Sequence, residues 1–532
     1  MTAEAKRRTG TMFEFKKPYL ARVATMFFLA AIAVSQVPAS PDIEQQQTQN
    51  DIKRSLKQAV KLTRAGLLSE SEKLLRDLIS ANPTSSAARI ELAFVLSKQR
   101  KLTEAYEIAY SIAQSEPNNA RAFSVLGSVL LTAGRFNDAR TVLYNALTLD
   151  KGDDLAWAGY GLIDFYENRI TTSLTNLQEA VYQNPNEPDY HFALAQVSAR
   201  AERYRDAADS YFRFLSVSKD TDKDRRDRIK GLIAFLRYLG GKEKLYQSVG
   251  SDSSTVKFEL IGNRPVIQVR VNGREDPLRF VLDTGSGITV MSDEAAKRLK
   301  VRQITRGGFA KGIGGDGRFE IVYGHLRSIE IGEAEVRNVP IYIRKFHDTR
   351  SNIDGYIGLA LISKFLTTID YGSNTFALTK KGADQREFRD NVALQLPLRL
   401  TSSGFLSGEV QLQGIDSPLN FIVDTGASVS VISGQVASFE AINRHIGNEK
   451  LRVIGAAGIT DDVPTYLLPK VTFGNHSRER IEAIALDLDM INEASGFEQN
   501  GILGGNFLKN YSLTFDFKNS RVTFRSVKPD RD

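Results

Sequence analysis

The spacing of apolar and polar residues changes once along the chain, at Gly240-Gly241. Between residues 51 and 240, apolar residues recur every three or four positions, which is the period of amphipathic helices. After the glycine pair, short runs such as Val266–Val271 are rich in β-branched residues and end at turn signals such as Asn272-Gly273. The pattern therefore predicts an all-α region followed by an all-β region.

The helical region carries a 34-residue repeat. Pro83 and Pro117 are separated by one period, and Pro185 follows after two more. Small residues recur in the same frame on both helices of each unit, at Ala59, Ala93, Gly127, Gly161 and Ala195, and at Ser71, Ala105, Ala139, Ser173 and Ala207. Small residues at fixed places allow two helices of a hairpin to cross closely, so the repeat predicts stacked helix pairs.

This pattern resembles the tetratricopeptide repeat, with five units over about residues 52–220 and a solvating, capping helix over Asp222–Leu239. The resemblance implies a concave face that recruits a peptide or a protein partner. A spacer or a dimerisation scaffold is the alternative. No single residue of the array is assigned to binding.

The β region is an internal duplication. One constant shift along the chain places Gln268–Gly273 on Glu409–Gly414, and Pro277–Phe280 on Pro418–Phe421. Each copy therefore opens with a predicted hairpin, and the two copies predict two similar lobes.

An apolar run ends in Asp-Thr-Gly at the same place in both copies, at Phe280–Gly285 and at Phe421–Gly426. Such a run predicts a buried strand that delivers a carboxylate onto a tight turn. Each copy also ends with two apolar residues before a glycine. The interval from Asp283 to Gly358 is nearly the same as the interval from Asp424 to Gly504. The matching frames argue against ordinary turns in a duplicated sandwich.

Two carboxylates that share one proton can hydrolyse an amide without a metal or a nucleophilic side chain. The ionised carboxyl takes a proton from the attacking water, and the protonated carboxyl donates to the substrate carbonyl oxygen. Like charges a few ångströms apart do not both ionise cheaply, so their apparent pKa values separate. Each copy would supply one half of the pair.

Residues 256–528 resemble aspartic peptidases of the pepsin and retropepsin type. The resemblance implies a catalytic pair, Asp283 and Asp424, with interlocking hydroxyls from Thr284 and Thr425. It implies supporting turn residues at Gly285, Ser286, Gly426 and Ala427, and distal glycines at Gly358 and Gly504 that pack beneath the turns. Serine at position 286 is similar to pepsin-like turns and can hydrogen-bond its aspartate, whereas alanine at position 427 is similar to the retroviral turn.

A flap is needed to cover the substrate and limit water. The candidates are the glycine-rich segments 307–319 and 454–459, with Gly312, Gly314, Gly315, Gly455 and Gly458. Neither has the tyrosine of the pepsin flap, and the first distal motif lacks the continuation that Gly505-Asn506 preserves.

The amino-acid composition argues against several other kinds of partner and site. The apolar content of 42% and the charged content of 25% are typical of a folded, soluble protein. The net charge of +7 is concentrated in the leader, where residues 1–22 hold six basic and two acidic side chains, so no nucleic-acid partner is expected. The chain has no cysteine and five scattered histidines, so we expect no disulfide, no metal site and no cofactor.

The leader predicts an export signal or a membrane anchor. Basic residues precede an uncharged run, Val23–Val34, and Val37-Pro38-Ala39 offers a cleavage site for a signal peptidase. We expect cleavage after about Ala39 and a location in a bacterial periplasm, with an uncleaved anchor at the outer face of the inner membrane as the alternative.

Together these patterns predict a multidomain chain with an all-α solenoid followed by an all-β bilobal acid-protease fold. The expected segments are a leader at 1–40, repeats at 51–240, a linker at 241–255, and lobes at 256–385 and 392–528. The function expected is an aspartic endopeptidase that cleaves peptide or protein substrates. A catalytically silent peptide-binding protein or a scaffold is the alternative.

Overall fold

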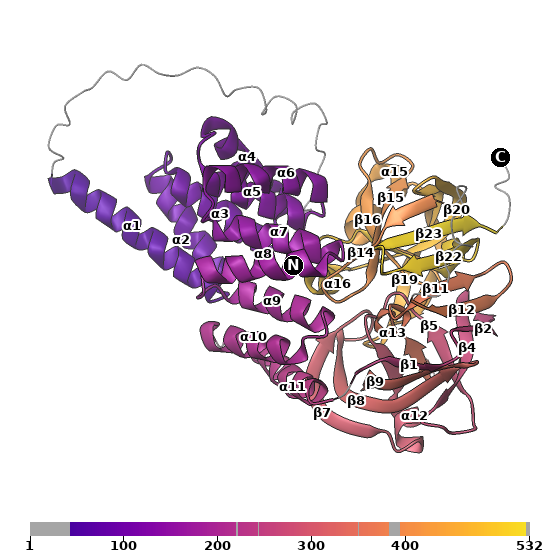
Figure 1. Cartoon of the computed structure of the whole chain (residues 1–532). Coiled ribbons are helices and arrows are strands. Elements are labelled where there is room, and N and C mark those ends of the chain that lie inside the picture. The colour runs from indigo at the N-terminus through magenta and orange to yellow at the C-terminus, as the bar shows by residue number, and fades with distance from the viewer. Residues whose placement is uncertain (1–42, 220–221, 243, 349, 382–393, 528–532) are drawn as a thin grey trace, which may run out of the picture. The chain divides into compact units, whose positions relative to one another are not determined.

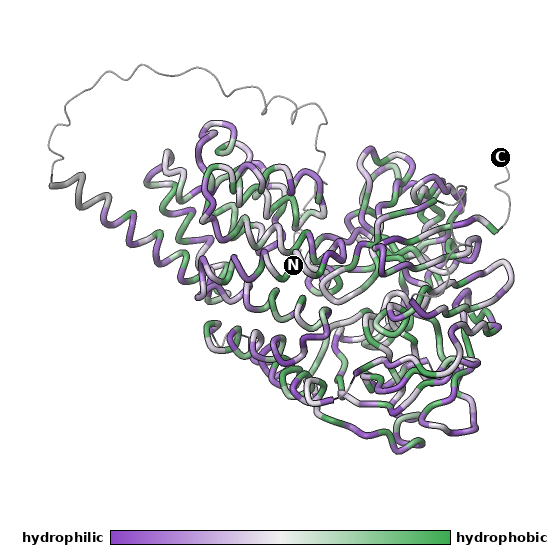
Figure 2. The backbone as a smooth tube through the Cα atoms, viewed as in Figure 1, coloured by the Kyte–Doolittle hydropathy of each residue, from purple (hydrophilic) through white to green (hydrophobic). Residues whose placement is uncertain are grey.

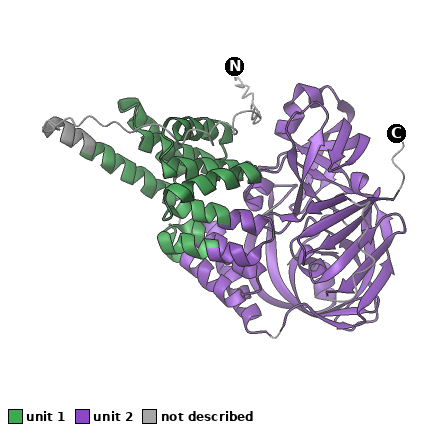
Figure 3. Ribbon diagram, turned by 45° about the horizontal axis from the view of Figure 1, so that its top comes forward, with its two compact units in different colours: residues 1–160, 176–190, 215–221 green, residues 161–175, 191–214, 222–532 purple. Residues whose placement is uncertain are grey.

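The computed structural model describes residues 43–219, 222–242, 244–348, 350–381 and 394–527 (Figure 1). The expected leader, residues 1–40, lies outside these ranges. Within them, no helix has the length and apolar character needed to cross a membrane. The chain divides into two compact units, residues 1–160, 176–190 and 215–221, and residues 161–175, 191–214 and 222–532 (Figure 3).

Helical hairpins fill the first part of the chain, and runs of hydrophobic residues alternate with hydrophilic ones along them (Figure 2). The helices are α1 (Ile43–Arg64), α2 (Leu68–Ala81), α3 (Ser86–Lys98), α4 (Leu102–Ser115), α5 (Ala120–Thr132), α6 (Phe136–Leu149), α7 (Asp154–Tyr166), α8 (Ile170–Gln183), α9 (Pro188–Arg200), α10 (Tyr204–Val217) and α11 (Lys223–Gly240).

The repeat positions explain the packing of these hairpins. The small residues Ala59, Ala93, Ala105 and Ala139 are fully buried. A β-carbon added at Gly127 would lie 2.6 Å from the side chain of Leu143, so only glycine allows α5 and α6 to approach this closely. The repeat frame therefore corresponds to helix pairs, as the sequence predicts.

Helix α11 is more than a solvating cap. Its Phe235 stacks on Tyr323 of the β region with 4.6 Å between ring centroids. The apolar residues on the same face of the helix are also buried, and they are Ile229, Ile233, Leu236 and Leu239. The amphipathic pattern of α11 indicates a buried face, and the structure shows that the β region covers it.

The first lobe is a nine-stranded sheet in the order β1-β9-β6-β10-β5-β4-β8-β7, with β3 paired to β4 and β8 also paired to β9. Its strands are β1 (Gln247–Gly250), β3 (Glu259–Ile261), β4 (Arg264–Val271), β5 (Leu278–Leu282), β6 (Thr289–Ser292), β7 (Arg302–Lys311), β8 (Arg318–Ile331), β9 (Ala334–Arg344) and β10 (Gly355–Ile357). The short helices α12 (Asp293–Arg298) and α13 (Leu359–Ile362) follow β6 and β10.

The second lobe repeats this topology in eight strands, ordered β14-β15-β16-β21-β17-β20-β19-β18. The strands are β14 (Arg399–Leu400), β15 (Leu406–Leu412), β16 (Leu419–Val423), β17 (Ser430–Ser433), β18 (Ile446–Ile454), β19 (Ile459–Phe473), β20 (His476–Leu486) and β21 (Gly501–Leu503). Its helices are α14 (Gly434–Ser438), α15 (Glu440–Asn443), α16 (Asp489–Ser495) and α17 (Gly505–Leu508). The all-α array followed by a bilobal β fold is thus confirmed.

A six-stranded sheet joins the lobes in the order β13-β23-β22-β11-β12-β2. Its strands are β2 (Ser253–Lys257), β11 (Phe365–Asp370), β12 (Thr375–Lys380), β13 (Leu394–Pro397), β22 (Tyr511–Asp516) and β23 (Arg521–Ser526). The central pair β11–β22 takes one strand from each lobe. The sequence suggests residues 241–255 as a linker, but in the structure they contain β1 and the start of β2. These short runs become strands because they pair with β9 and β12, which lie far away in the chain.

Candidate active site

The same arrangement of strands positions Asp283 and Asp424. In the first lobe β10 runs parallel to β5, and the N–H of Asp283 donates to the carbonyl of Ile357 at 3.0 Å. In the second lobe β21 runs parallel to β16, and the N–H of Asp424 donates to the carbonyl of Leu503 at 3.0 Å. The distal strand of each copy therefore holds the backbone of its own aspartate.

The distal glycines Gly358 and Gly504 lie directly beneath the turns. A β-carbon at Gly358 would lie 2.5 Å from the backbone of Ile288, and one at Gly504 would lie 2.6 Å from the backbone of Val429. Any larger residue would push the turn away from the distal strand. The apolar-apolar-glycine pattern therefore has a packing reason in both lobes.

The threonines of the two turns interlock across the lobes. Thr284 Oγ1 donates to the carbonyl of Val423 at 2.6 Å and accepts the N–H of Thr425 at 3.0 Å. Thr425 Oγ1 donates to the carbonyl of Leu282 at 2.7 Å and accepts the N–H of Thr284 at 3.2 Å. Both threonines are fully buried, so the four hydrogen bonds fix the register of one turn against the other.

Each turn glycine faces the aspartate of the opposite lobe. A β-carbon on Gly285 would lie 2.4 Å from Cγ of Asp424, and one on Gly426 would lie 2.6 Å from Oδ1 of Asp283. The glycine N–H groups donate to their own aspartates, at 2.9 Å in the first lobe and 2.7 Å in the second. The absence of side chains at these glycines lets the two carboxyl groups lie close enough for each to affect the pKa of the other.

The two carboxyl groups do not have equivalent surroundings. Burial raises the pKa of Asp283, but a 2.5 Å hydrogen bond from Ser286 Oγ, the N–H of Gly285 and the nearby cation of Arg344 act in the opposite direction. Burial and the charge of Asp283 raise the pKa of Asp424 well above its usual range. Alanine, the residue that follows the second Asp-Thr-Gly, offers no matching hydroxyl. The proton of the pair is therefore favoured on Asp424.

The candidate flaps meet tip to tip. The N–H of Gly315 donates to the carbonyl of Ile459 at 3.1 Å, and the N–H of Ala457 donates to the carbonyl of Ile313 at 2.9 Å. Gly455 closes the second tip with a 2.8 Å hydrogen bond to Gly458, and Gly312 closes the first with one of 3.0 Å to Gly317. Four tip glycines have positive φ angles, which favour glycine, and these are Gly314 at 95°, Gly315 at 56°, Gly317 at 75° and Gly458 at 149°.

The first flap tip also reaches the opposite lobe. Ile313 packs against an apolar cluster of the second lobe, and Ala427 and Val429 beside the second turn pack against the same cluster. The buried members of this cluster are Ile422, Val431, Val463, Ile484, Leu488 and Ile502. The tip of the first hairpin thus contacts the same apolar cluster as the turn that carries Asp424.

Sequence reasoning missed Arg344, which ends β9. Its guanidinium lies 4.7 Å from the ring of Phe346 and 5.5 Å from that of Phe319, and Nη1 donates to the carbonyl of Ala456 in the second flap at 3.3 Å. No motif marks Arg344 in the chain. Arg344 lies near the Asp283 turn because β9 pairs with β6, where Arg344 is the partner of Ser292.

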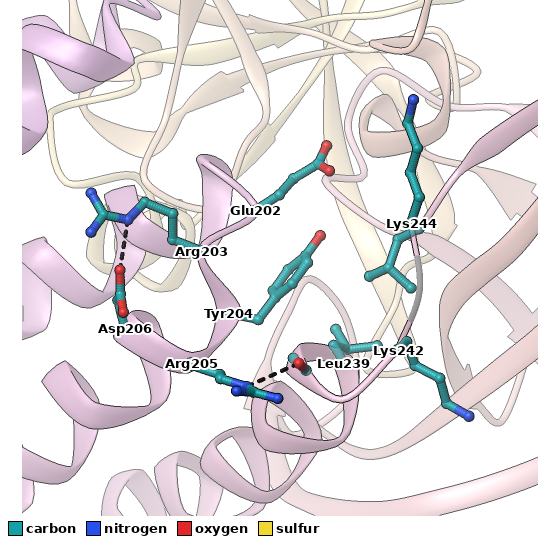
Figure 4. A pocket seen from close by; sticks show the side chains of 10 residues that line it. Glu202, Arg203, Tyr204, Arg205, Asp206, Leu239, Lys242 and Lys244 are labelled. Atoms are coloured by element: carbon teal, nitrogen blue, oxygen red, sulfur yellow. Dashed lines mark hydrogen bonds and ion pairs between the residues drawn. The ribbon is translucent and has the colours of Figure 1, made fainter.

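Among the described residues, neither a metal site nor the pocket described below coincides with the aspartate pair. In the described part of the chain, no three His, Asp or Glu side chains gather in a way that could hold a metal ion. A pocket of about 330 Å³ is lined by Glu202–Asp206 and by residues around Leu239–Leu245 (Figure 4). Among its charged groups, Arg203 pairs with Asp206, and Arg205 donates to the carbonyl of Gly240. Neither aspartate of the pair lines it.

Three protein-family models match segments of this chain. An aspartyl protease model matches residues 267–361, a model of the gag-polyprotein type of aspartyl protease matches residues 409–510, and a tetratricopeptide repeat model matches residues 167–249. The two protease matches fall on the two lobes and include both Asp-Thr-Gly turns.

Three similar proteins each match part of the chain. The cell division cycle protein 27 homolog of Caenorhabditis elegans is 35% identical over 89 residues, which are 17% of this chain and 11% of that protein. A tetratricopeptide repeat protein of Thermus thermophilus is 20% identical with a TM-score of 0.30, over 34% of this chain and 98% of its own. PilF of Pseudomonas aeruginosa is 18% identical with a TM-score of 0.27, over 36% of this chain and 89% of its own.

The chain therefore combines a tetratricopeptide-type helical array with two lobes of the aspartyl protease type. The resemblances that the sequence suggests are confirmed at this level.

Proposed function

We propose that this protein is an aspartic endopeptidase whose single active site takes Asp283 from one lobe and Asp424 from the other. The observation that carries the proposal is that each turn glycine lies directly against the aspartate of the opposite lobe, which brings the two carboxyl groups close together. Two buried carboxyls that share a proton form an acid and a base at one point.

In this mechanism Asp283 is the ionised member of the resting pair, because Ser286 donates a hydrogen bond to it and Ala427, at the matching position, gives Asp424 no such donor. It accepts a proton from the attacking water, while Asp424 donates its proton to the carbonyl oxygen of the scissile bond. The tetrahedral intermediate then collapses as its C–N bond breaks. Asp283 gives the proton that it took from water to the leaving amine, and Asp424 regains its proton from a hydroxyl group of the intermediate, which becomes the carboxyl product. The flap tips must open to admit substrate and close to limit water.

The test uses the full-length protein and a mixed peptide library between pH 4 and 8. Cleavage that is blocked by a statine-type transition-state mimic and is absent in Asp424→Asn supports the proposal. Library peptides that bind without being cleaved would instead make the protein a silent peptide binder. Cleavage that persists in Asp424→Asn would also contradict it.

We further propose that the helical array recruits the substrate or a protein partner. The ring of Phe94 on α3 makes cation–π contacts with two side chains. Lys98 Nζ lies 4.9 Å from the ring centroid, and the guanidinium of Arg121 on α5 lies 5.5 Å from it. Phe94→Ala should slow cleavage of a protein substrate and leave cleavage of a short peptide unchanged. Equal effects on both substrates would argue against recruitment.

The basic and apolar pattern of residues 1–40 supports a proposal that the protein acts after export to the periplasm or at the outer face of the inner membrane. The N-terminal sequence of the protein recovered from cell fractions tests it. A mature start near residue 40 in the periplasmic fraction is the expected result, and an intact leader in the cytoplasmic fraction would contradict the proposal.

A further inference from the structure

Arg344 lies among aromatic rings at one side of the aspartate pair. Its guanidinium is 4.7 Å from the ring of Phe346, 5.5 Å from Phe319 beside the tip of the first flap, and 5.8 Å from Tyr356. Tyr356 belongs to β10, where it pairs with Val281 beside the strand that leads to Asp283. The cation thus lies where the flap, the distal strand and the catalytic turn of the first lobe meet.

The hydrogen bonds of Arg344 extend to the opposite lobe. Nη1 donates to the carbonyl of Ala456 in the second flap tip at 3.3 Å and to the carbonyl of Lys345 at 3.2 Å. The charge of Arg344 also opposes the rise that burial causes in the pKa of Asp283. Arg344 therefore lies near both the reacting pair and the opposite flap.

Arg344 has no ion-pair partner among the described residues, although it is partly buried. Other arginines of this lobe have carboxylate partners, such as Arg270 with Glu330 at 3.1 Å and Arg264 with Asp348 at 3.6 Å. A partly buried guanidinium with two long hydrogen bonds to carbonyls keeps most of its five N–H donors available for another acceptor.

The duplication identifies the corresponding position in the second lobe. Ser292 pairs with Arg344 in parallel register, and its counterpart in the second copy, Ser433, pairs with Leu486 in the same way. Leu486 is partly buried and packs against the apolar cluster that includes Val431. The two positions are thus equivalent places in the two lobes. The first lobe has a cation there and the second has an apolar side chain.

We propose that Arg344 and Leu486 make the protein selective for peptides with an acidic residue on one side of the scissile bond and an apolar residue on the other. This inference rests on the proposed endopeptidase function. The substrate carboxylate takes the guanidinium N–H groups in a bidentate pair and replaces the long hydrogen bond to Ala456. Arg344 is a specificity residue in this scheme, and the aspartates alone carry the chemistry.

The test compares kcat/KM of the full-length protein for peptides that differ only in a Glu, Gln, Leu or Lys placed near the scissile bond opposite an apolar residue. Glu is expected to exceed Gln by about tenfold or more, and Lys to be the poorest. The advantage of Glu over Gln should shrink below about pH 4.3, where a free Glu side chain becomes protonated.

Arg344→Leu should reverse the order, so that the Leu peptide becomes better than the Glu peptide, and Arg344→Lys should retain part of the Glu preference. The matched control is Arg270→Leu, which makes the same change at the ion pair with Glu330 and should keep the preference. A Glu preference that survives Arg344→Leu would overturn the inference.

The outcomes separate this inference from the function on which it rests. Cleavage that depends on Asp424 but shows no acidic preference would overturn the specificity and leave the peptidase in place. The absence of Asp424-dependent cleavage for every peptide would overturn the proposed function itself.

Discussion

The two lobes share the parts that build the aspartate pair and differ in the parts that surround it. Strand register, interlocking threonines, turn glycines and distal glycines are the same in both. The surroundings differ in the residue after each Asp-Thr-Gly, in the distal motif and in whether a helix packs on the flap. The paired positions that differ are Ser286 and Ala427, Arg344 and Leu486, and Ala360 and Asn506.

The flaps show the difference most clearly. Helix α11 packs on β7 in the first lobe, with Gly231 so close that an added β-carbon would lie 2.2 Å from the carbonyl oxygen of Arg306. In the second lobe β18 is exposed along almost its whole length, including Ile446 and Leu451. We infer that the first flap is braced and that the second moves more freely.

The distal motifs differ in a similar way. Asn506 Oδ1 accepts the N–H and the Oγ hydroxyl of Ser430 at 3.0 and 2.8 Å, and Nδ2 donates to the carbonyl of Glu482 at 2.7 Å. Ala360 occupies the matching place in the first lobe, and its methyl group can make none of these bonds. The two lobes are thus alike in the turns that bring the carboxyl groups together, and they differ in the residues around those turns.

The threonine interlock should give the largest effect if its symmetry is broken. Thr284→Val and Thr425→Val each keep the side-chain shape but lose the hydroxyl and leave a buried N–H without an acceptor, so each should lower the free energy of unfolding by about 2–4 kcal/mol. Denaturant titration of each variant measures this loss. A large cost for one variant alone would show that the interlock is not reciprocal.

The second-largest effect is expected where α11 packs against the first flap. Gly231→Ala improves the intrinsic helix propensity of α11 but forces it away from Arg306, so we expect a net loss of about 1–3 kcal/mol and a raised KM. Lys230→Ala, at an exposed neighbouring position, is the control. A stabilised Gly231→Ala protein with unchanged KM would show that α11 does not hold the flap.

The unequal carboxyls predict unequal stability effects. Because folding raises the pKa of Asp424, its contribution to stability is complete below the unfolded pKa and is lost as pH rises through the folded pKa. Asp424→Asn should therefore stabilise the protein at neutral pH, and Asp283→Asn should do so less. Thermal unfolding from pH 4 to 8 measures both. The reverse ranking would contradict the assignment of the proton to Asp424.

The smallest expected effect is a shift in pH dependence. Ser286→Ala removes the donor that acts to lower the pKa of Asp283, so the acidic limb of the kcat/KM profile should move to higher pH. Ala427→Ser would place a hydroxyl beside Asp424 and should move the basic limb to lower pH. Unchanged limbs in both variants would mean that position 286 does not set the asymmetry.

Much of this architecture could be predicted from the sequence, because the constraints fall on residue types at fixed spacing. Only glycine fits at positions 285 and 426, and the helix pairs need small residues in one repeating frame. Arg344 could not be predicted, because it lies far from the turn in the chain and only strand register brings it near. The packing of α11 on the β region could not be predicted either. An amphipathic pattern shows that one face of a helix is buried, but it does not show which element covers that face.

The central claim is that one site uses one aspartate from each lobe, and a double-mutant comparison of kcat/KM tests it most directly. Asp283→Asn and Asp424→Asn should each lower kcat/KM by about 10²–10⁴-fold, and the double variant should be no worse than either single variant, since each removes the same site. Losses that multiply in the double variant, or substantial activity in either single variant, would contradict the claim.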